Sequence, residues 1–147
     1  MPNIHELSSH VAIDQVIDPI SVSSAGTANG DSLDMQEYDG CLFLLSVGAI
    51  APTGTIDAKI TSDALTAFGS PTDVPGAALT QIDDIGDDKV YAIDVHGKMP
   101  EQFIRIEVTD AVAVARVRGV LAIRYRGRRA PVVQSADVAE LVSVALT

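Results

Sequence analysis

Aromatic residues and cysteine are scarce in this chain of 147 residues, which contains no tryptophan, three tyrosines, three phenylalanines and one cysteine. A shortage of aromatic rings argues against a sugar-binding surface built on stacked aromatic side chains. The single cysteine, Cys41, cannot form a disulfide within the chain and lies in the most apolar run, so we expect a buried core residue rather than a nucleophile. A chain of this length can bury a substantial core without disulfides.

Charged residues are also few, at 20% of the chain, and the formal net charge is −10. Acidic residues dominate the first 100 positions, whereas basic residues outnumber acidic ones after position 100. Because an acidic chain is a poor partner for the phosphate backbone, we expect no direct nucleic-acid binding. No apolar run reaches the roughly 18 residues of a membrane-spanning helix, so we expect no membrane partner. Hydrophobic residues still make up 47%, which favours burial of some apolar surface against partner subunits.

Motifs for catalysis and for cofactors are missing. The sequence contains no phosphate-binding glycine loop, no His-Glu-x-x-His, no Cys-x-x-Cys and no Gly-x-Ser-x-Gly. A dyad of Cys41 with His96 would lack an orienting group and oxyanion donors. His5 and His10 have no carboxylate or cysteine at ligand spacing, and the acidic turn at 83–88 lacks the spacing of a calcium loop. We therefore expect no enzymatic activity, no cofactor and no metal site.

Alternation of apolar and polar residues predicts β-strands through most of the chain. The run at 41–47 is almost continuously apolar between two glycines, which is typical of a central strand, and 55–61 alternates, so we expect the two to pair as a hairpin. Further strands are predicted at 16–23, 32–35, 77–82, 89–96, 103–109 and 117–125. In the last of these, Gly119 falls on the apolar phase with Leu121 and Ile123, which indicates a bulge or a close approach from the opposite sheet.

Several short strands with turn signals between them predict an all-β fold, an antiparallel β-sandwich or jelly-roll-like barrel. We assign residues 16–130 to this β-sandwich core, 1–15 to an extended N-terminal arm and 131–147 to an extended C-terminal arm. Two conformations stay open for 132–147. Ser135 would cap a helix, whereas the spacing of Val138, Val142, Val144 and Leu146 favours an extended chain.

The best candidate site combines a basic cluster with this apolar C-terminal arm. In a strand, Arg124 and Arg126 point to one face, so we expect their guanidinium groups to emerge side by side. Arginine pairs bidentately with carboxylates, which favours docking on an acidic protein surface; a charged edge that prevents strand aggregation is the structural alternative, and phosphate binding is a third. The residues expected to contact a partner are Arg124, Arg126, Arg128, Arg129, Val138, Leu141 and Val142.

Six stretches of the sequence, in their order and strand pattern, are similar to a known protein family. Residues 35–40 (Met-Gln-Glu-Tyr-Asp-Gly) lead into 43–50 (Phe-Leu-Leu-Ser-Val-Gly-Ala-Ile) and 54–60 (Gly-Thr-Ile-Asp-Ala-Lys-Ile), and the stretches 90–95, 103–106 and 128–132 follow later. In their order and strand pattern they resemble the capsid decoration (cement, auxiliary head) proteins of tailed bacteriophages. The resemblance runs from position 15 to the last residue.

This resemblance implies a structural virion protein on the outer surface of a phage capsid. It would bind the major capsid protein, stabilise the shell and form a homo-oligomer, with a homotrimer favoured. The first alternative is a head-completion or tail structural component of the same particle. A carbohydrate-binding sandwich module is the second.

Overall fold

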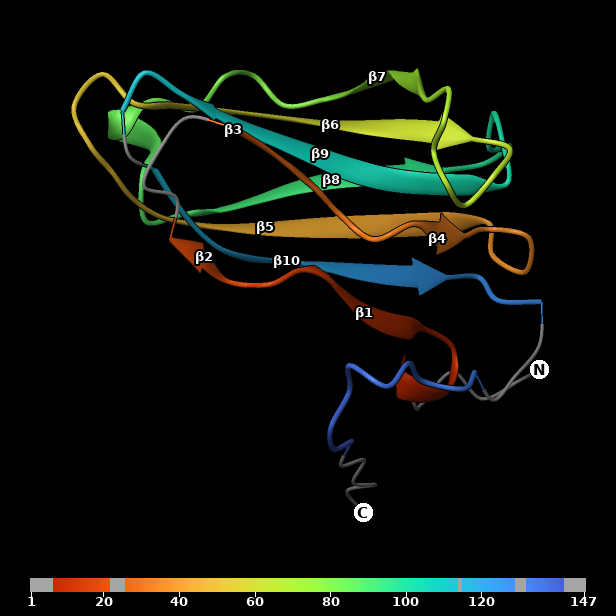
Figure 1. The fold of residues 1–147 in the computed structure, drawn as a ribbon. Helices are drawn as coiled ribbons and strands as arrows, with labels where there is room; N and C mark the ends of the chain where they lie inside the picture. Colours follow the sequence, from red (N-terminus) through yellow and green to blue (C-terminus); the bar gives the residue numbers. More distant parts are fainter. Residues whose placement is uncertain (1–6, 22–25, 114, 129–131, 142–147) are drawn as a thin grey trace.

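The structure, a computed structural model, describes residues 7–21, 26–113, 115–128 and 132–141, and the statements below concern these residues. It is a two-layer sandwich of antiparallel sheets, which confirms the expected all-β fold (Figure 1). The strands are β1 (Ala12–Ile17), β2 (Ile20–Ser21), β3 (Gly26–Asn29), β4 (Leu33–Asp34), β5 (Gly40–Ile50), β6 (Thr55–Asp63), β7 (Thr72–Ala78), β8 (Val90–His96), β9 (Phe103–Ala111) and β10 (Ala115–Tyr125). Two short 3-10 helices are also present, η1 (Leu7–Ser9) and η2 (Asp84–Gly86).

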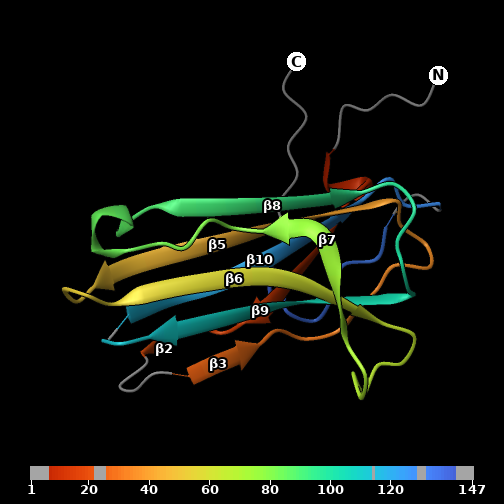
Figure 2. The ribbon, with the colours of Figure 1, turned by 90° about the horizontal axis from the view of Figure 1, so that it is seen from above.

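Each layer is one sheet. Sheet A has the strand order β1-β10-β5-β8, with β2 also paired to β10, and sheet B has the order β3-β9-β6-β7, with β4 paired to β9. Figures 1 and 2 show sheet B lying over sheet A, with the long strands of both layers roughly aligned. Aligned packing of this kind is typical of β-sandwiches.

The core lies between the layers and consists of alternate, inward-pointing residues of both sheets. Phe43 and Leu45 on β5 are each 1% exposed, and Ile104 and Ile106 on β9 are at most 1% exposed. Burying one apolar side chain of this size contributes about 1.5 to 3 kcal/mol. Two sheets with one apolar face each can bury both faces only by packing against each other.

The expected hairpin between 41–47 and 55–61 is wrong, although both strands exist. β5 pairs with β10 and β8 in sheet A, whereas β6 pairs with β9 and β7 in sheet B. The connection at 51–54 therefore crosses between the layers, and its turn is closed by the Gly54 amide, which donates to the Ala51 carbonyl over 2.8 Å. A hairpin and a crossing between layers both join two amphipathic strands by a short turn, so the pattern does not distinguish them.

The first strand begins earlier than predicted. β1 occupies Ala12–Ile17, inside the expected N-terminal arm, and Pro19 separates it from the two-residue β2. In β1 the inward positions include the carboxylate of Asp14, which is buried against Arg124. A charged residue at a core position interrupts the apolar alternation from which strands are predicted, because its burial depends on a distant partner.

Gly119 produces the predicted bulge in β10. The register of β10 against β5 shifts between Val117 and Gly119, and Gly119 has a φ of +119°, which favours glycine. The bulge changes which side chains face inward: Val120 and Ala122 are fully buried, whereas Leu121 is 42% exposed on the outer face. The expected phase, with Leu121 inward, is thus wrong beyond the bulge.

Candidate functional site

Arg124 lies inside the sandwich at one end of sheet A. Its Nε donates to Asp14 Oδ2 over 3.0 Å, and its Nη1 donates to the Asp34 carbonyl of β4 over 3.0 Å. The guanidinium group also lies 4.7 Å from the centre of the Tyr38 ring. With a side chain that is only 16% exposed, Arg124 joins sheet A to sheet B.

The expectation that Arg124 and Arg126 emerge side by side is therefore wrong. β10 ends at Tyr125, and Arg126 has a φ of +54°, so the alternation of a strand does not extend to it. Arg124 is occupied within the fold, whereas Arg126 is exposed. The alternation in the sequence places Arg124 and Ala122 on the same face of β10, but it does not show whether this face points to the core or to solvent.

Arg126 and Arg128 are the accessible members of the basic cluster. Both line a wide hollow of about 670 Å³ at the end of the sandwich, together with Lys98 and Met99. Arg128 lies near the carboxylate of Asp39, with 3.9 Å between Nη2 and Oδ1. That ion pair is exposed and weak, so it leaves the guanidinium group available. Contact with a partner through Arg126 and Arg128 stays a prediction, and Arg129 lies outside the described residues.

A C-terminal segment that is not itself a strand lies along the free edge of β1. The side chain of Gln134 makes three hydrogen bonds there: Oε1 accepts from the Ile13 amide over 2.9 Å, and Nε2 donates to the carbonyls of Ser8 over 2.9 Å and Val11 over 2.6 Å. Ser135 Oγ donates to the Ile13 carbonyl over 3.0 Å. Side chains thus take the place of a neighbouring strand.

These anchors were not identified from the sequence. The only local signal is the polar group Gln134, Ser135 and Asp137 within an otherwise apolar arm, and this pattern equally fits a helix start. In the structure, Asp137 Oδ2 accepts from the Gln15 amide over 3.1 Å. The described part of the arm, 132–141, contains neither helix nor strand.

Two of the apolar residues expected to contact a partner lie in this segment. Val138 is half-buried, and its amide donates to the Ser135 carbonyl over 3.2 Å. Leu141 is 47% exposed. Val142 lies outside the described residues. The structure thus presents Leu141 at the surface, and its partner role stays a prediction.

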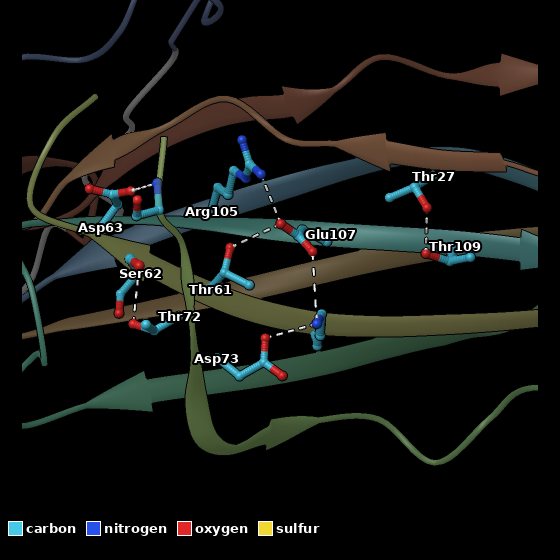
Figure 3. Close-up of polar contacts among 11 residues, drawn as sticks. Thr27, Thr61, Ser62, Asp63, Thr72, Asp73, Arg105, Glu107 and Thr109 are labelled. Carbon is cyan, nitrogen blue, oxygen red and sulfur yellow. Dashed lines mark hydrogen bonds and ion pairs between the residues drawn. The ribbon is translucent and has the colours of Figure 1, made fainter. Parts of the chain in front are cut away.

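The outer face of sheet B is polar and is held together by internal contacts (Figure 3). Glu107 accepts from Arg105 Nη2 over 2.8 Å and from Thr61 Oγ1 over 3.3 Å, and Lys59 Nζ lies 4.0 Å from its other oxygen. Lys59 also donates to Asp73 over 2.8 Å, and this hydrogen bond raises the pKa of Lys59. The contacts brace β6, β7 and β9 against one another.

The loop that follows β6 folds back on this face. Asp63 accepts from the amides of Leu65 and Ser70, each over 2.9 Å, and these hydrogen bonds lower the pKa of the Asp63 carboxyl. Within the loop, Phe68 is 7% exposed, and its ring centre lies 4.4 Å from the guanidinium carbon of Arg105. Phe68 is therefore part of the packing rather than a surface platform.

None of the six aromatic side chains, all in the described ranges, is exposed; they are Tyr38, Phe43, Phe68, Tyr91, Phe103 and Tyr125. A module that stacks sugars presents aromatic rings to solvent, so this distribution argues against the carbohydrate-binding alternative. Cys41 is fully buried, and burial raises the pKa of its thiol, which disfavours the nucleophilic thiolate. Within the described ranges, no group of three or more His, Cys, Asp or Glu is arranged to hold a metal ion.

The described chain also contains no helix that is long and apolar enough to cross a membrane. Its architecture defines a class, the antiparallel two-sheet β-sandwich, with accessible basic groups at one end and apolar groups on the C-terminal segment.

Comparison with known proteins places this sandwich beside chains from a virus. A chain in the structure of infectious bursal disease virus, Gt strain, aligns with a TM-score of 0.52 and 14% identity over 78% of this chain and 31% of that chain. A chain from the Gx strain aligns with a TM-score of 0.49 and 14% identity over 82% of this chain and 34% of that one. At such identity the likeness shows the fold alone, and this chain spans about a third of their length. No family model and no curated protein matches it.

Proposed function

We propose that this protein is a structural component of a virus particle that binds the outer surface of a tailed-phage capsid and contacts the major capsid protein. The observation that carries the proposal is the sandwich fold shared with a chain of infectious bursal disease virus. The strand pattern of the sequence, which resembles phage decoration proteins, supports the finer assignment. The proposed role is binding without catalysis.

Two features of the surface fit such a role. Arg126 and Arg128 are exposed at one end of the sandwich, where guanidinium groups can pair with carboxylates of a neighbouring subunit. Leu141 presents an apolar side chain on a segment at the edge of sheet A. A protein that binds the assembled shell and not its separated subunits stabilises the shell by mass action. We further propose a homotrimer as the binding unit.

The test uses expanded capsids that lack decoration, mixed with the purified protein. We expect co-sedimentation at micromolar protein and a higher temperature of capsid disruption. If no binding occurs at micromolar protein, the proposal is wrong. Sedimentation equilibrium of the free protein, whose chain mass is 15.4 kDa, tests the homotrimer separately.

Copy number in intact particles separates the main proposal from its alternative. A decoration protein repeats over the lattice and is present in roughly hundreds of copies, because it follows the symmetry of the shell. A head-completion or tail component occupies a single vertex and is present in about a dozen copies or fewer. Quantitative mass spectrometry of purified particles, calibrated against the major capsid protein, distinguishes these outcomes.

A further inference from the structure

Most sheet edges of this sandwich are protected against pairing with another chain. At the β1 edge, the C-terminal segment bonds to the strand through Gln134 and Ser135. In sheet B, β3 and β4 are only four and two residues long, and β7 contains Pro75 and Gly76, the latter with a φ of +77°. Short strands, prolines and local distortions all hinder the addition of a further strand.

The edge at β8 has none of these protections in the described part of the chain. β8 is seven residues long, its register against β5 has no shift, and it contains no proline, glycine or lysine. Figure 2 shows it at the margin of sheet A, beside β5. Within the described ranges β5 is its only strand partner, so the other side of β8 presents free backbone groups.

Hydrogen bonds at the two ends of β8 show which of its backbone groups are free. At one end the Val47 amide donates to the Lys89 carbonyl over 2.9 Å, and at the other the Gly97 amide donates to the Asp39 carbonyl over 2.9 Å. Because bonded and non-bonded residues alternate along an antiparallel pair, every second residue between Lys89 and Gly97 faces β5. The residues in the other phase direct their N–H and C=O groups to the free edge: Val90, Ala92, Asp94 and His96.

The side chains of β8 are mostly apolar on the side of the core. Tyr91 is half-buried, and Ile93 and Val95 are 8% and 9% exposed. A cleft of about 540 Å³ between β8 and β7 reaches both Ile93 and Val95. On the outer side the strand has one charged group, the carboxylate of Asp94, which accepts from the Tyr125 hydroxyl over 2.5 Å. The edge thus offers a nearly neutral strand with apolar groups at the opening of the core.

We propose that β8 pairs antiparallel with β8 of a second copy of this chain, about a two-fold axis at Ile93. In this register Ala92 lies opposite Asp94 of the second copy, and Val90 lies opposite His96 of the second copy. Every residue of β8 that faces the free edge then exchanges backbone hydrogen bonds with its counterpart. The contact joins the two five-stranded sheets A into one continuous sheet.

Side-chain chemistry favours this register over its neighbours. On the core side Ile93 meets Ile93, and Tyr91 meets Val95 of the second copy, so the inner row is apolar. An axis at Asp94 would place two carboxylates directly opposite each other, which is unfavourable. An axis at Ala92 would place His96 opposite Asp88, which lies outside the strand and has a φ of +50°.

Charge favours a copy of this strand as the occupant. With a net charge of −10, two copies repel each other over most of their surfaces, so a contact between them requires a region of low charge. β8 meets this requirement, and it adjoins the outer face of sheet A, which carries Leu42, Leu44 and Leu121. A two-fold contact is also compatible with a separate trimer contact, because one copy can take part in both.

Disulfide trapping tests both the contact and its register. Val90→Cys and His96→Cys each add one cysteine at an exposed position of β8, while Cys41 is buried. When the two variants are mixed at micromolar protein under mild oxidation, we expect a covalent dimer that contains one chain of each. Val90→Cys alone is the matched control, because two copies of position 90 lie six residues, or about 20 Å, apart along the paired strands. We expect at least tenfold slower dimer formation in the control, and equal rates or no mixed dimer would overturn the proposal.

A proline variant tests the backbone contact without an added cysteine. Ala92→Pro removes an N–H that faces the free edge and no hydrogen bond within the sandwich, so we expect circular dichroism to show an unchanged fold. We expect self-association, measured by analytical ultracentrifugation, to be at least tenfold weaker than in Ala92→Ser, which retains the N–H. Equal self-association of the two variants would contradict the proposal. Both assays use free protein without capsids, so their outcome is independent of the proposed function.

Discussion

Arg124 and Arg126 are two positions apart, yet their surroundings are opposite. Arg124 is enclosed by Asp14, Tyr38 and the Asp34 carbonyl, whereas Arg126 is exposed beyond the end of β10. Removing one partner of a buried ion pair leaves the other charge unpaired in a poorly solvated position. Removing an exposed arginine leaves no buried charge unpaired and changes stability little.

We predict that Arg124→Met lowers the free energy of unfolding by roughly 2 to 3 kcal/mol, because Asp14 is left buried without its cation. Urea denaturation followed by circular dichroism measures the change. Arg126→Met is the matched control, with an expected change below about 0.5 kcal/mol. Equal losses for the two variants would show that Arg124 does not join the sheets.

The hydroxyl of Tyr125 makes a pH-dependent contribution to the free energy of unfolding. Its burial and its hydrogen bond to Asp94 raise the pKa of Tyr125 to about 12. An unfolded tyrosine has a pKa of about 10, so the folded state retains the proton more tightly. The stabilisation is complete below pH 10 and is lost as the pH rises from 10 through 12.

We therefore predict that the parent protein loses more stability between pH 9 and about 12 than the variant Tyr125→Phe, which has no phenolic proton to lose. Urea midpoints measured for both proteins across this range give the difference. Other ionisable groups titrate equally in the two proteins and cancel. Identical pH profiles would rule out a role for the Tyr125 proton.

Among the elements, β1 shows most clearly what the sequence predicts and what it does not. The strand at 41–47 follows from a continuous apolar run and those at 55–61, 89–96 and 103–109 from local alternation, and the structure confirms them within a few residues. Partners are not local, since β1 pairs with β10 more than 100 positions away. The layer crossing at 51–54 and the inward Asp14 depend on such partners, so the hairpin and the first boundary were predicted wrongly.

The candidate site divides in the same way. Composition identified the arginines. Whether Arg124 faces the core or solvent depends on the distant strands that pack around β10, including β1 with Asp14. The edge anchors Gln134 and Asp137 were missed because side-chain hydrogen bonds to a distant strand leave no periodic signal.

We predict that Gln134→Ala accelerates hydrogen exchange of the Ile13 amide about fivefold, since the amide loses its acceptor and one hydrogen bond contributes about 1 kcal/mol. Hydrogen exchange resolved by NMR provides the measurement. Gln81→Ala is a suitable control, because the exposed Gln81 also makes a side-chain hydrogen bond, but to Asp57 on sheet B. Unchanged protection of Ile13 would mean that the C-terminal segment does not close the edge of β1.

At the scale of the whole molecule, the outer surfaces differ in chemistry. The face of sheet B is polar and internally paired, the face of sheet A is apolar, and one end presents Arg126 and Arg128. The proposed particle subunit must bind neighbours without aggregating in solution, and surfaces of different chemistry allow separate contacts.

The charged end gives a prediction about capsid binding. We expect the double variant Arg126→Glu with Arg128→Glu to bind expanded capsids at least tenfold more weakly, since attraction to carboxylates becomes repulsion. Binding isotherms at two salt concentrations measure the effect, which salt should diminish. Lys89→Glu is the control, because Lys89 is an exposed base toward the opposite end of β5, where its carbonyl accepts from the Val47 amide. A variant that bound as well as the parent protein would remove these arginines from the interface.

The position of β10 between β1 and β5 also determines when the molecule can fold during synthesis. Sheet A lacks strand β10 until residues 115–125 have left the ribosome. β1 therefore has no strand to pair with while about 100 further residues are translated. Until then β5 has only β8 as a strand partner, and β1 has none. Folding of sheet A is thus expected to follow the emergence of β10, so the earlier strands of this sheet stay unpaired for longer than the small size of the sandwich indicates.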